Sequence, residues 1–234
     1  SADEHIGGYA SFRVDITTLV KAGENEIFVI AEDDVRSGHQ PGGKQSKKYS
    51  SYGCSYTRTT GIWQTVWLEF VPRAYIKSVK YYPNITNGTL TVTGEVEGGG
   101  ELTLCSSYEG KPTGSAVIHV NGGFFTAQLS LSEVHLWEIG HGRLYDLELK
   151  FGEDTVKSYF GIREVSLDGL KFMLNHKPIF LRTVLDQGFY PDGIYTAPTD
   201  SAMLFDIEAT KQMGFNMIRK HIKVEPEEFY YQCD

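Results

Sequence analysis

The sequence predicts a mainly β protein that changes to an α/β arrangement near its end. Apolar and polar residues alternate with a period of two through much of the chain between Tyr9 and Ile162, as they do in half-buried strands. Gly, Asn and Pro separate these runs and favour turns between them. After Ile162 the pattern becomes strand, helix, strand, helix with short links, which is typical of a parallel α/β unit.

The first strand-rich region covers residues 1–71. Alternation is clear in two runs on either side of the turn KAGEN, at Phe12, Val14, Ile16 and then at Ile27, Val29, Ala31. A long loop rich in Gly, Ser, Lys and Tyr, residues 37–60, leads into the candidate strand GIWQTVWLEF. Pro72 then blocks a continuing ladder and marks the boundary with the next domain.

Residues 72–162 contain seven short candidate strands punctuated by Gly, Asn and Pro. Seven short strands in a segment of this size are typical of an immunoglobulin-like β-sandwich, here without the Cys-Trp-Cys signature of antibody domains. The strands are expected at 74–82, 88–97, 101–109, 116–120, 124–131, 144–151 and 155–162.

Residues 163–234 carry the α/β pattern. A strand pair is expected around KFMLNHKPIFLRTV, and its last part, Ile179–Val184, would be the first strand of a β/α barrel. Phe215–Arg219 would be the second barrel strand.

Two helices are expected in the same region. The first begins with Asp200 as its cap and stops at Gly214, with one face formed by Met203, Ile207, Thr210 and Met213. The second opens at Pro226 and reaches Asp234 without a Gly or Asn cap, so we expect the sequence to be a segment of a longer protein.

Composition and charge exclude two classes of partner. Twenty-two Lys and Arg residues against thirty Asp and Glu residues give a net charge of −8, and no basic block is long enough for a phosphate stripe, so nucleic acid is not expected. The densest basic run, residues 44–48, lies among Gly and Ser and is interpreted as a solvated loop without chemistry. No run approaches the ~20 apolar residues of a membrane span.

The common catalytic and metal motifs are absent from the sequence. No G-x-S-x-G, H-E-x-x-H, Walker or G-x-G-x-x-G pattern occurs. Cys54, Cys105 and Cys233 are widely spaced and fit neither a disulfide framework nor a zinc site. No acidic ligand cluster is visible either, so the sequence predicts neither a metal site nor a cofactor.

Polar residues follow the two predicted barrel strands, at the ends that form the active-site mouth of a β/α barrel. Asp186 and Gln187 follow the first strand, and Arg219 and His221 end the second. We predict that these four residues bind a hydroxyl-rich substrate. The alternative is that Asp186 and Gly188 build a turn, that Arg219 pairs with a surface acid and that His221 is structural.

Exposed aromatic residues in the β regions allow two interpretations. Their ring faces could stack on sugar rings, or they could belong to core and inter-domain packing. The residues concerned are Tyr49, Tyr52, Tyr56, Trp63, Trp67 and Trp137.

Four collinear segments carry a family resemblance: GGYASFRVDITTLVKAGENEIFVIAEDD, GIWQTVWLEF, HLWEIGHGRLYDLELKFG with YFGIREV, and LNHKPIFLRTVLDQGFYPDG through FNMIRKH. Together they resemble glycoside hydrolase family 2, the family of bacterial β-galactosidases, β-glucuronidases and β-mannosidases. The resemblance implies part of a sugar-binding jelly roll in residues 1–71, an immunoglobulin-like domain in 72–162 and the start of a TIM barrel in 163–234.

The chain departs from the family pattern after the first barrel strand. Many β-galactosidases carry Arg-Gly-Val-Asn and a His-rich run there, whereas this chain has RTVL and then Asp186, Gln187 and Gly188. A substrate-binding His of the family is replaced by Gln187, so galactosidase specificity does not transfer. Arg219 matches the second-strand Arg that lies near the nucleophile in the family, and His221 matches the neighbouring His only approximately.

The resemblance implies a fragment of an enzyme that hydrolyses β-glycosidic bonds. Family members are retaining hydrolases with one Glu as acid/base on barrel strand four and another as nucleophile on strand seven. This chain contains only the first two barrel strands, so no catalytic residue is assigned and the fragment itself is expected to be inactive. The alternative is a naturally complete, non-catalytic carbohydrate-binding or structural β-sandwich protein.

The implied partners are a β-linked oligosaccharide or glycoside as substrate and the remainder of the TIM barrel. The resemblance also allows a homo-oligomer, Mg or Na ions in some members, and a cytoplasmic or periplasmic location in a bacterium.

Overall fold

The computed structural model describes residues 3–234, so Ser1 and Ala2 of the predicted first domain lie outside the described residues. The chain forms two compact units. The first unit contains residues 3–66, 184–212 and 218–232, and the second contains residues 67–183, 213–217 and 233–234. The division of the chain into domains at residues 71 and 162 stays a prediction.

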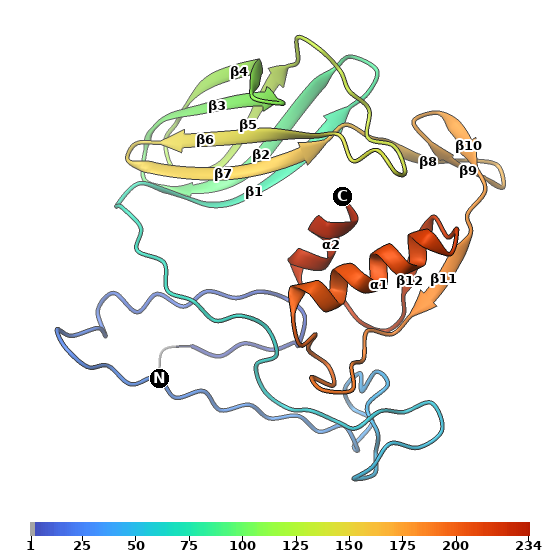
Figure 1. Ribbon diagram of the computed structural model, residues 1–234. Helices are drawn as coiled ribbons and strands as arrows, with labels where there is room; N and C mark the ends of the chain where they lie inside the picture. The colour runs from blue at the N-terminus through green and yellow to red at the C-terminus, as the bar shows by residue number, and fades with distance from the viewer. Residues whose placement is uncertain (1–2) are drawn as a thin grey trace. The chain divides into compact units, whose positions relative to one another are not determined.

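A β-sandwich of two sheets forms most of the second unit (Figure 1). One sheet has the strand order β1-β2-β5 and the other has the order β4-β3-β6-β7, with antiparallel pairing throughout. All seven strands predicted for this region are present, and the predicted mainly β fold class is confirmed. The strands are β1 (Tyr75–Asn84), β2 (Thr89–Glu97), β3 (Gly100–Tyr108), β4 (Lys111–Val120), β5 (Gly123–Ser130), β6 (Leu144–Phe151) and β7 (Asp154–Gly161).

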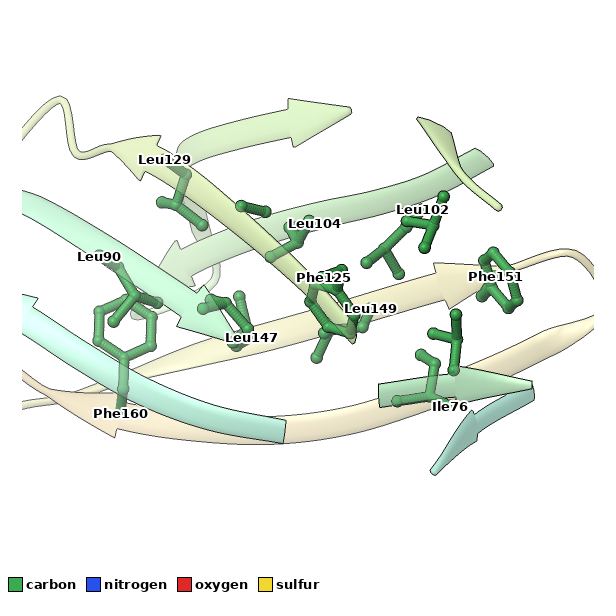
Figure 2. Packing of buried hydrophobic residues seen from close by; sticks show 14 of the residues in the cluster. Ile76, Leu90, Leu102, Leu104, Phe125, Leu129, Leu147, Leu149, Phe151 and Phe160 are labelled. Carbon is green, nitrogen blue, oxygen red and sulfur yellow. The ribbon is translucent and has the colours of Figure 1, made fainter. Parts of the chain in front are cut away.

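Apolar side chains from both sheets meet between them and form the core (Figure 2). In β6 every second side chain is fully buried, namely Tyr145, Leu147, Leu149 and Phe151. Consecutive strand residues point to opposite faces, so the period-two pattern of the sequence gives each strand one buried face. Full burial of one large apolar side chain contributes about 1.5–3 kcal/mol.

Tyr145 also fixes the connection that leads into β6. Its hydroxyl accepts a hydrogen bond from the His135 N–H at 2.6 Å and donates one to the Glu133 carbonyl at 3.1 Å. Its ring stacks on Phe160 of β7, with the ring centroids 4.9 Å apart. This arrangement is the tyrosine corner of immunoglobulin-like sandwiches, in which a core residue satisfies backbone groups of the preceding loop.

A small antiparallel sheet, β10-β9-β8, follows the sandwich in the second unit. The β9–β10 hairpin turns at Asn175 and His176, whose φ angles of 50° and 63° suit a type I′ turn. Asn175 Oδ1 accepts the Glu164 N–H at 3.0 Å, and Asn175 Nδ2 donates to the Trp137 carbonyl at 2.9 Å. The hairpin is therefore tied to the end of the sandwich. The strands are β8 (Val165–Asp168), β9 (Lys171–Leu174) and β10 (Lys177–Ile179).

Residues 3–74 contain no regular β-strand, so the strands predicted between residues 9 and 70 are wrong. Only isolated bridges occur in this region, all of them within residues 45–56. Alternation predicts burial, yet Ile27 is 68% exposed and Val29 is 62% exposed. The reason is pairing: a strand needs a neighbour to take up its backbone hydrogen bonds, and these segments meet none in the described chain.

Strand, helix, strand and helix then follow in the predicted order. The Arg182 carbonyl accepts the Asn216 N–H at 3.0 Å, and the Asp186 carbonyl accepts the His221 N–H at 2.8 Å. The partners advance in the same direction along both strands, so β11 and β12 are parallel. The elements are β11 (Thr183–Asp186), α1 (Asp200–Gln212), β12 (Met217–Lys220) and α2 (Glu227–Cys233).

Several boundaries differ from the prediction. Ile179 belongs to β10, so the strand predicted at residues 179–184 starts only at Thr183. Thr199 caps α1 in place of Asp200, because Thr199 Oγ1 accepts a backbone N–H of the first turn at 3.2 Å. Gly214, with a φ of 87°, follows α1 as the predicted stop.

The predicted apolar face of α1 is present only in part. Met203 is buried, whereas Met213 lies beyond the end of the helix and is exposed. Neither helix, nor any other helical segment of residues 3–234, combines the length and hydropathy of a membrane-spanning segment.

Leu104→Ala should destabilise the sandwich, because Leu104 is fully buried between its sheets. Losing the side chain removes apolar burial and leaves a cavity, which lowers the free energy of unfolding by about 2–5 kcal/mol. Val117→Ala on the adjacent strand β4 is the control, since Val117 is 58% exposed, and it should change this free energy by less than about 0.5 kcal/mol. Urea unfolding followed by circular dichroism measures both variants, and equal losses would contradict this description of the core.

Candidate functional site

A row of four charged side chains lies at the carboxyl ends of β11 and β12, within the first unit. Asp186 Oδ2 at the end of β11 is 2.5 Å from Lys220 Nζ at the end of β12. Lys220 Nζ is also 2.6 Å from Glu225 Oε1, and Glu225 Oε2 is 3.0 Å from Lys223 Nζ. The charges alternate in sign along these four residues, which we call the ionic row, so each ammonium meets a carboxylate.

Lys223 is the most deeply buried cation of the ionic row, with 1% of its side chain exposed. Its Nζ donates to the Gly188 carbonyl at 2.6 Å and to the Tyr195 carbonyl at 2.7 Å, and it also faces Glu225. Burial lowers the pKa of Lys223, and the Glu225 carboxylate opposes that shift. A buried ammonium is tolerated here because its three donors all have acceptors.

Gly188 has no side chain and so leaves room for the ionic row. Its N–H donates to Asp186 Oδ1 at 2.8 Å, so the loop after β11 starts with a tight turn. Its φ is +64°, and a Cβ at this position would collide with Glu225 Oε1. Both the backbone conformation and the packing of the ionic row therefore require glycine. Because Lys223 binds the carbonyls at both ends of residues 188–195, it closes this loop.

Two isoleucines beside the ionic row have a left-handed backbone, with φ angles of 55° at Ile194 and 61° at Ile222. This conformation is unusual for a β-branched residue and costs about 1–3 kcal/mol at each position. The Ile222 carbonyl accepts a hydrogen bond from the Tyr9 hydroxyl at 3.1 Å, and Ile194 exchanges two backbone hydrogen bonds with Tyr190. The surrounding contacts thus hold both loops in conformations that their residues disfavour.

Aromatic rings enclose the Lys223 ammonium. Its Nζ lies 4.6 Å from the centroid of the Tyr195 ring and 5.3 Å from that of Trp63. The two rings meet edge to face with centroids 4.8 Å apart, and the Thr196 hydroxyl donates to the Trp63 carbonyl at 2.9 Å. Burial raises the pKa of Tyr195. Of the aromatic residues considered from the sequence, Trp63 therefore packs against the ionic row.

The two faces of the β11–β12 pair differ. On the face of the ionic row, Lys220 Nζ lies 4.7 Å from the ring centroid of Phe229 in α2. Asp206 of α1 interacts electrostatically with Asp186 and Lys220 on the same face, and burial raises the pKa of Asp206. Arg219 precedes Lys220 in β12, so its side chain points to the opposite face, where it is exposed. The helices thus cover the ionic row and leave Arg219 on the open face.

The four predicted substrate-binding residues lie in different surroundings. The Asp186 carboxylate contacts Lys220 and also accepts the Gly188 N–H. The second contact is the one that the alternative turn interpretation requires. Gln187 Oε1 is buried and accepts no hydrogen bond within residues 3–234. Arg219 is exposed on the open face, and His221 is half-buried and donates its N–H to the Asp186 carbonyl. Substrate binding by these residues stays a prediction.

Lys223 and Glu225 organise this site but were not among the predicted site residues. The segment HIKVE does show polar and apolar residues in alternation. Alternation normally places the apolar side chains inside, yet here Lys223 and Glu225 are buried while Ile222 and Val224 are about half exposed. The charged side chains are buried because they form ion pairs with each other, and the periodicity of the sequence does not indicate such pairs.

The ionic row does not fit a metal ion. No group of three or more His, Cys, Asp or Glu side chains suited to a metal occurs in residues 3–234. Magnesium and sodium need uncommitted oxygen ligands, whereas the Asp186 and Glu225 carboxylates already face ammonium groups.

Sequence comparison relates the chain to known enzymes. Residues 74–163 match the model of the family described as Glycosyl hydrolases family 2. A putative β-glucuronidase from Formosa agariphila is 26% identical over 100% of this chain and 29% of its own length. A β-galactosidase from Thermoanaerobacter pseudethanolicus is 26% identical over 99% of this chain and 32% of its own length. The predicted resemblance to glycoside hydrolase family 2 is confirmed, and the chain spans less than a third of the length of these two relatives.

Solved structures show a similar fold. A β-glucuronidase from Faecalibacterium prausnitzii has a TM-score of 0.62 and 24% identity, over 69% of this chain and 26% of that chain. The apo β-glucuronidase from Ruminococcus gnavus has a TM-score of 0.61 and 20% identity, over 70% of this chain and 28% of that chain.

Gly188→Ala should be more destabilising than Gly214→Ala. Both glycines have positive φ, 64° and 87°, so alanine strains the backbone at either position by about 1–2 kcal/mol. A Cβ meets nothing within 4 Å at Gly214, whereas at Gly188 it collides with Glu225, which should lower the free energy of unfolding by a further ~1–3 kcal/mol. Urea unfolding compares the two variants, and similar losses would show that the ionic row has room for a side chain.

Lys223 and Glu225 should be energetically coupled. Lys223→Met leaves a buried carboxylate with fewer partners, and Glu225→Gln leaves buried ammonium groups without their counter-ion. Each change should lower the free energy of unfolding by about 3–5 kcal/mol. The double variant should lose less than the sum, because either single change already breaks the pair. A double-mutant cycle measured in urea tests this, and strictly additive losses would argue against a coupled pair.

Proposed function

We propose that this chain is part of a retaining β-glycosidase of glycoside hydrolase family 2 and contains the first two strands of its catalytic barrel. The relatives that align with nearly all of the chain carry the names of a β-glucuronidase and a β-galactosidase, and residues 74–163 match the family model. The parallel order β11, α1, β12, α2 supports the assignment of a barrel start, because (β/α)8 barrels repeat this unit.

The open face of β11 and β12 is the observation that carries this proposal. In a β/α barrel the helices lie outside the strands and the opposite strand face points into the barrel. Here the helices cover the ionic row, while Leu185 and Met217 on the other face are 47% and 39% exposed. Further barrel strands would cover these apolar side chains and enclose Arg219 near the reacting sugar.

Catalysis then requires carboxylates from outside this chain. Retaining glycosidases place two carboxyl groups about 5–5.5 Å apart on either side of the scissile bond. Glu225 is committed to the ionic row with 2% of its side chain exposed, and Glu227 and Glu228 begin α2 on the helical side. The acid/base and the nucleophile would therefore come from later barrel strands, and the 234-residue chain alone would be inactive.

Gln187 and Arg219, near the carboxyl ends of β11 and β12, suggest how the substrate is held. We assign a β-linked glycoside as substrate, with Gln187 Oε1 accepting a hydrogen bond from a sugar hydroxyl and Arg219 donating to sugar or carboxylate oxygens. The buried Gln187 Oε1 without a partner in residues 3–234 supports this role. The ionic row contains two ammoniums and two carboxylates. With no net charge, it shapes the loops and does not attract a charged sugar.

The 234-residue chain should not hydrolyse nitrophenyl β-glycosides, whereas a protein extended through the rest of its reading frame should hydrolyse at least one of them. A panel of galactoside, glucuronide, mannoside and glucoside substrates, assayed with both proteins, checks this. Turnover by the short chain would refute the assignment of catalysis to later strands. A reading frame without further barrel strands would instead favour the non-catalytic carbohydrate-binding or structural module.

In the extended protein, Arg219→Met should lower kcat/KM for the preferred glycoside by about a hundredfold, since it removes charged donors at the reacting centre. Lys211→Met at the exposed end of α1 is the control and should leave kcat/KM unchanged. Steady-state kinetics on both variants tests the role of the open face. Wild-type kinetics for Arg219→Met would place that face outside the active site.

A further inference from the structure

Residues 35–60 form a basic segment in an acidic chain. They contain no Asp or Glu, although the whole chain has a net charge of −8. Their basic residues are Arg36, Lys44, Lys47, Lys48 and Arg58. A local excess of one charge on a protein of the opposite net charge marks a surface that attracts a different class of ligand from the rest of the molecule.

The segment has a defined internal structure, although it contains no regular strand or helix. Ser46 is fully buried, its Oγ donates to the Ser50 carbonyl at 2.7 Å, and its N–H donates to the Tyr56 carbonyl at 2.7 Å. The Tyr56 ring stacks on Phe189 with centroids 4.0 Å apart and an interplanar angle of 15°. The interpretation of residues 44–48 as a solvated loop is therefore incomplete, because these contacts hold the backbone of the segment in a defined conformation.

Exposed tyrosine rings and cations stand together on this segment. Arg36 Cζ and Arg58 Cζ lie 5.1 Å and 4.7 Å from the centroid of the Tyr49 ring, which is 85% exposed. Lys48 Nζ lies 4.5 Å from the centroid of Tyr52. Hydrogen bonds from Arg36 and Arg58 lower the pKa of Tyr49. We call these five residues the Tyr49 patch.

The two arginines of the patch are only weakly compensated. The Arg36 N–H donates to Asp34 Oδ1 at 3.2 Å, and this hydrogen bond, together with the charge of Arg36, lowers the pKa of Asp34. Neither Arg36 nor Arg58 forms an ion pair with a carboxylate anywhere in residues 3–234, in contrast to Lys220 and Lys223 of the ionic row. A planar guanidinium presents a fork of donors that matches the oxygens of a carboxylate or sulfate group. An exposed tyrosine ring offers an apolar face to the apolar face of a sugar.

We propose that the Tyr49 patch binds an acidic polysaccharide, with Arg36 and Arg58 on its anionic groups and the rings of Tyr49 and Tyr52 against its sugars. The choice of a glycan rests on the proposed β-glycosidase function, whereas the need for an anion rests on the patch alone. A nucleic acid is also a polyanion, so the experiment below compares it directly with the polysaccharide.

Affinity electrophoresis of the 234-residue chain tests the proposal. Native gels containing polygalacturonate should retard the protein, and gels containing neutral galactan should not. Arg36→Gln combined with Arg58→Gln should weaken the binding to polygalacturonate by about tenfold or more, since two charge-assisted contacts are lost. Tyr49→Ala, which keeps both arginines, should weaken it to a smaller extent.

The matched control is Arg73→Gln combined with Lys111→Gln. These two residues are exposed on the second unit, and their replacement removes the same charge, so retardation should stay at the wild-type level. Mobility in ligand-free gels corrects each variant for its own charge, and circular dichroism confirms that each is folded. Equal weakening in both double variants would reduce the effect to net charge and overturn the proposal.

Two other results would also overturn it. Equal retardation by neutral galactan would remove the role of the anionic group, and equally tight binding of single-stranded DNA would make the patch a general polyanion surface. Failure of this proposal is distinguishable from failure of the proposed function. The glycan assay involves no turnover, and the nitrophenyl glycosides used for turnover carry no polysaccharide to engage the patch.

Discussion

The loops that follow β11 and β12 depend on one interaction, the binding of the buried Lys223 ammonium to its three acceptors. One nitrogen atom joins the Gly188 and Tyr195 carbonyls of the loop after β11 to Glu225 of the segment after β12. Removal from water is expensive for an ammonium, so its presence is compatible with folding only when all acceptors are in place. The loop, the glycine that leaves space for it and the strained backbone at Ile222 are therefore parts of one arrangement.

The sandwich was predictable from the sequence because each of its strands has a period-two pattern bounded by turn residues, even where the pairing is distant in the chain, as between β2 and β5. All seven expected strands of residues 72–162 appear, and the period-two pattern correctly marks core residues such as Leu104 and Leu147. The order β11, α1, β12, α2 was also predictable, because Gly214 separates helix from strand and Pro226 precedes the second helix. Local signals sufficed wherever alternation bounded by turns, or a helix cap, marks the element.

Two parts were not predictable, for different physical reasons. Residues 3–74 have the alternation of strands, but alternation reports a preference and cannot supply the hydrogen-bonding neighbour that a strand needs. The ionic row reverses the usual rule, because Lys223 and Glu225 are buried while their apolar neighbours are exposed. Of the predicted site residues, Asp186 belongs to this row, whereas Arg219 lies on the opposite face. Arg219 and Lys220 are neighbours in β12, so their side chains point to opposite faces, and only Lys220 reaches the ionic row.

The contrast between the ionic row and the Tyr49 patch gives the first unit two different responses to ionic strength. The row is largely buried and its charges cancel, so dissolved ions screen it weakly. The patch is largely exposed and carries an excess of positive charge, and at physiological ionic strength its field extends only about 8 Å. Added salt would thus release an anion from the patch while the loops around Lys223 keep their shape. Electrolyte concentration would therefore separate anion binding by the surface patch from the stability of the buried ion pairs.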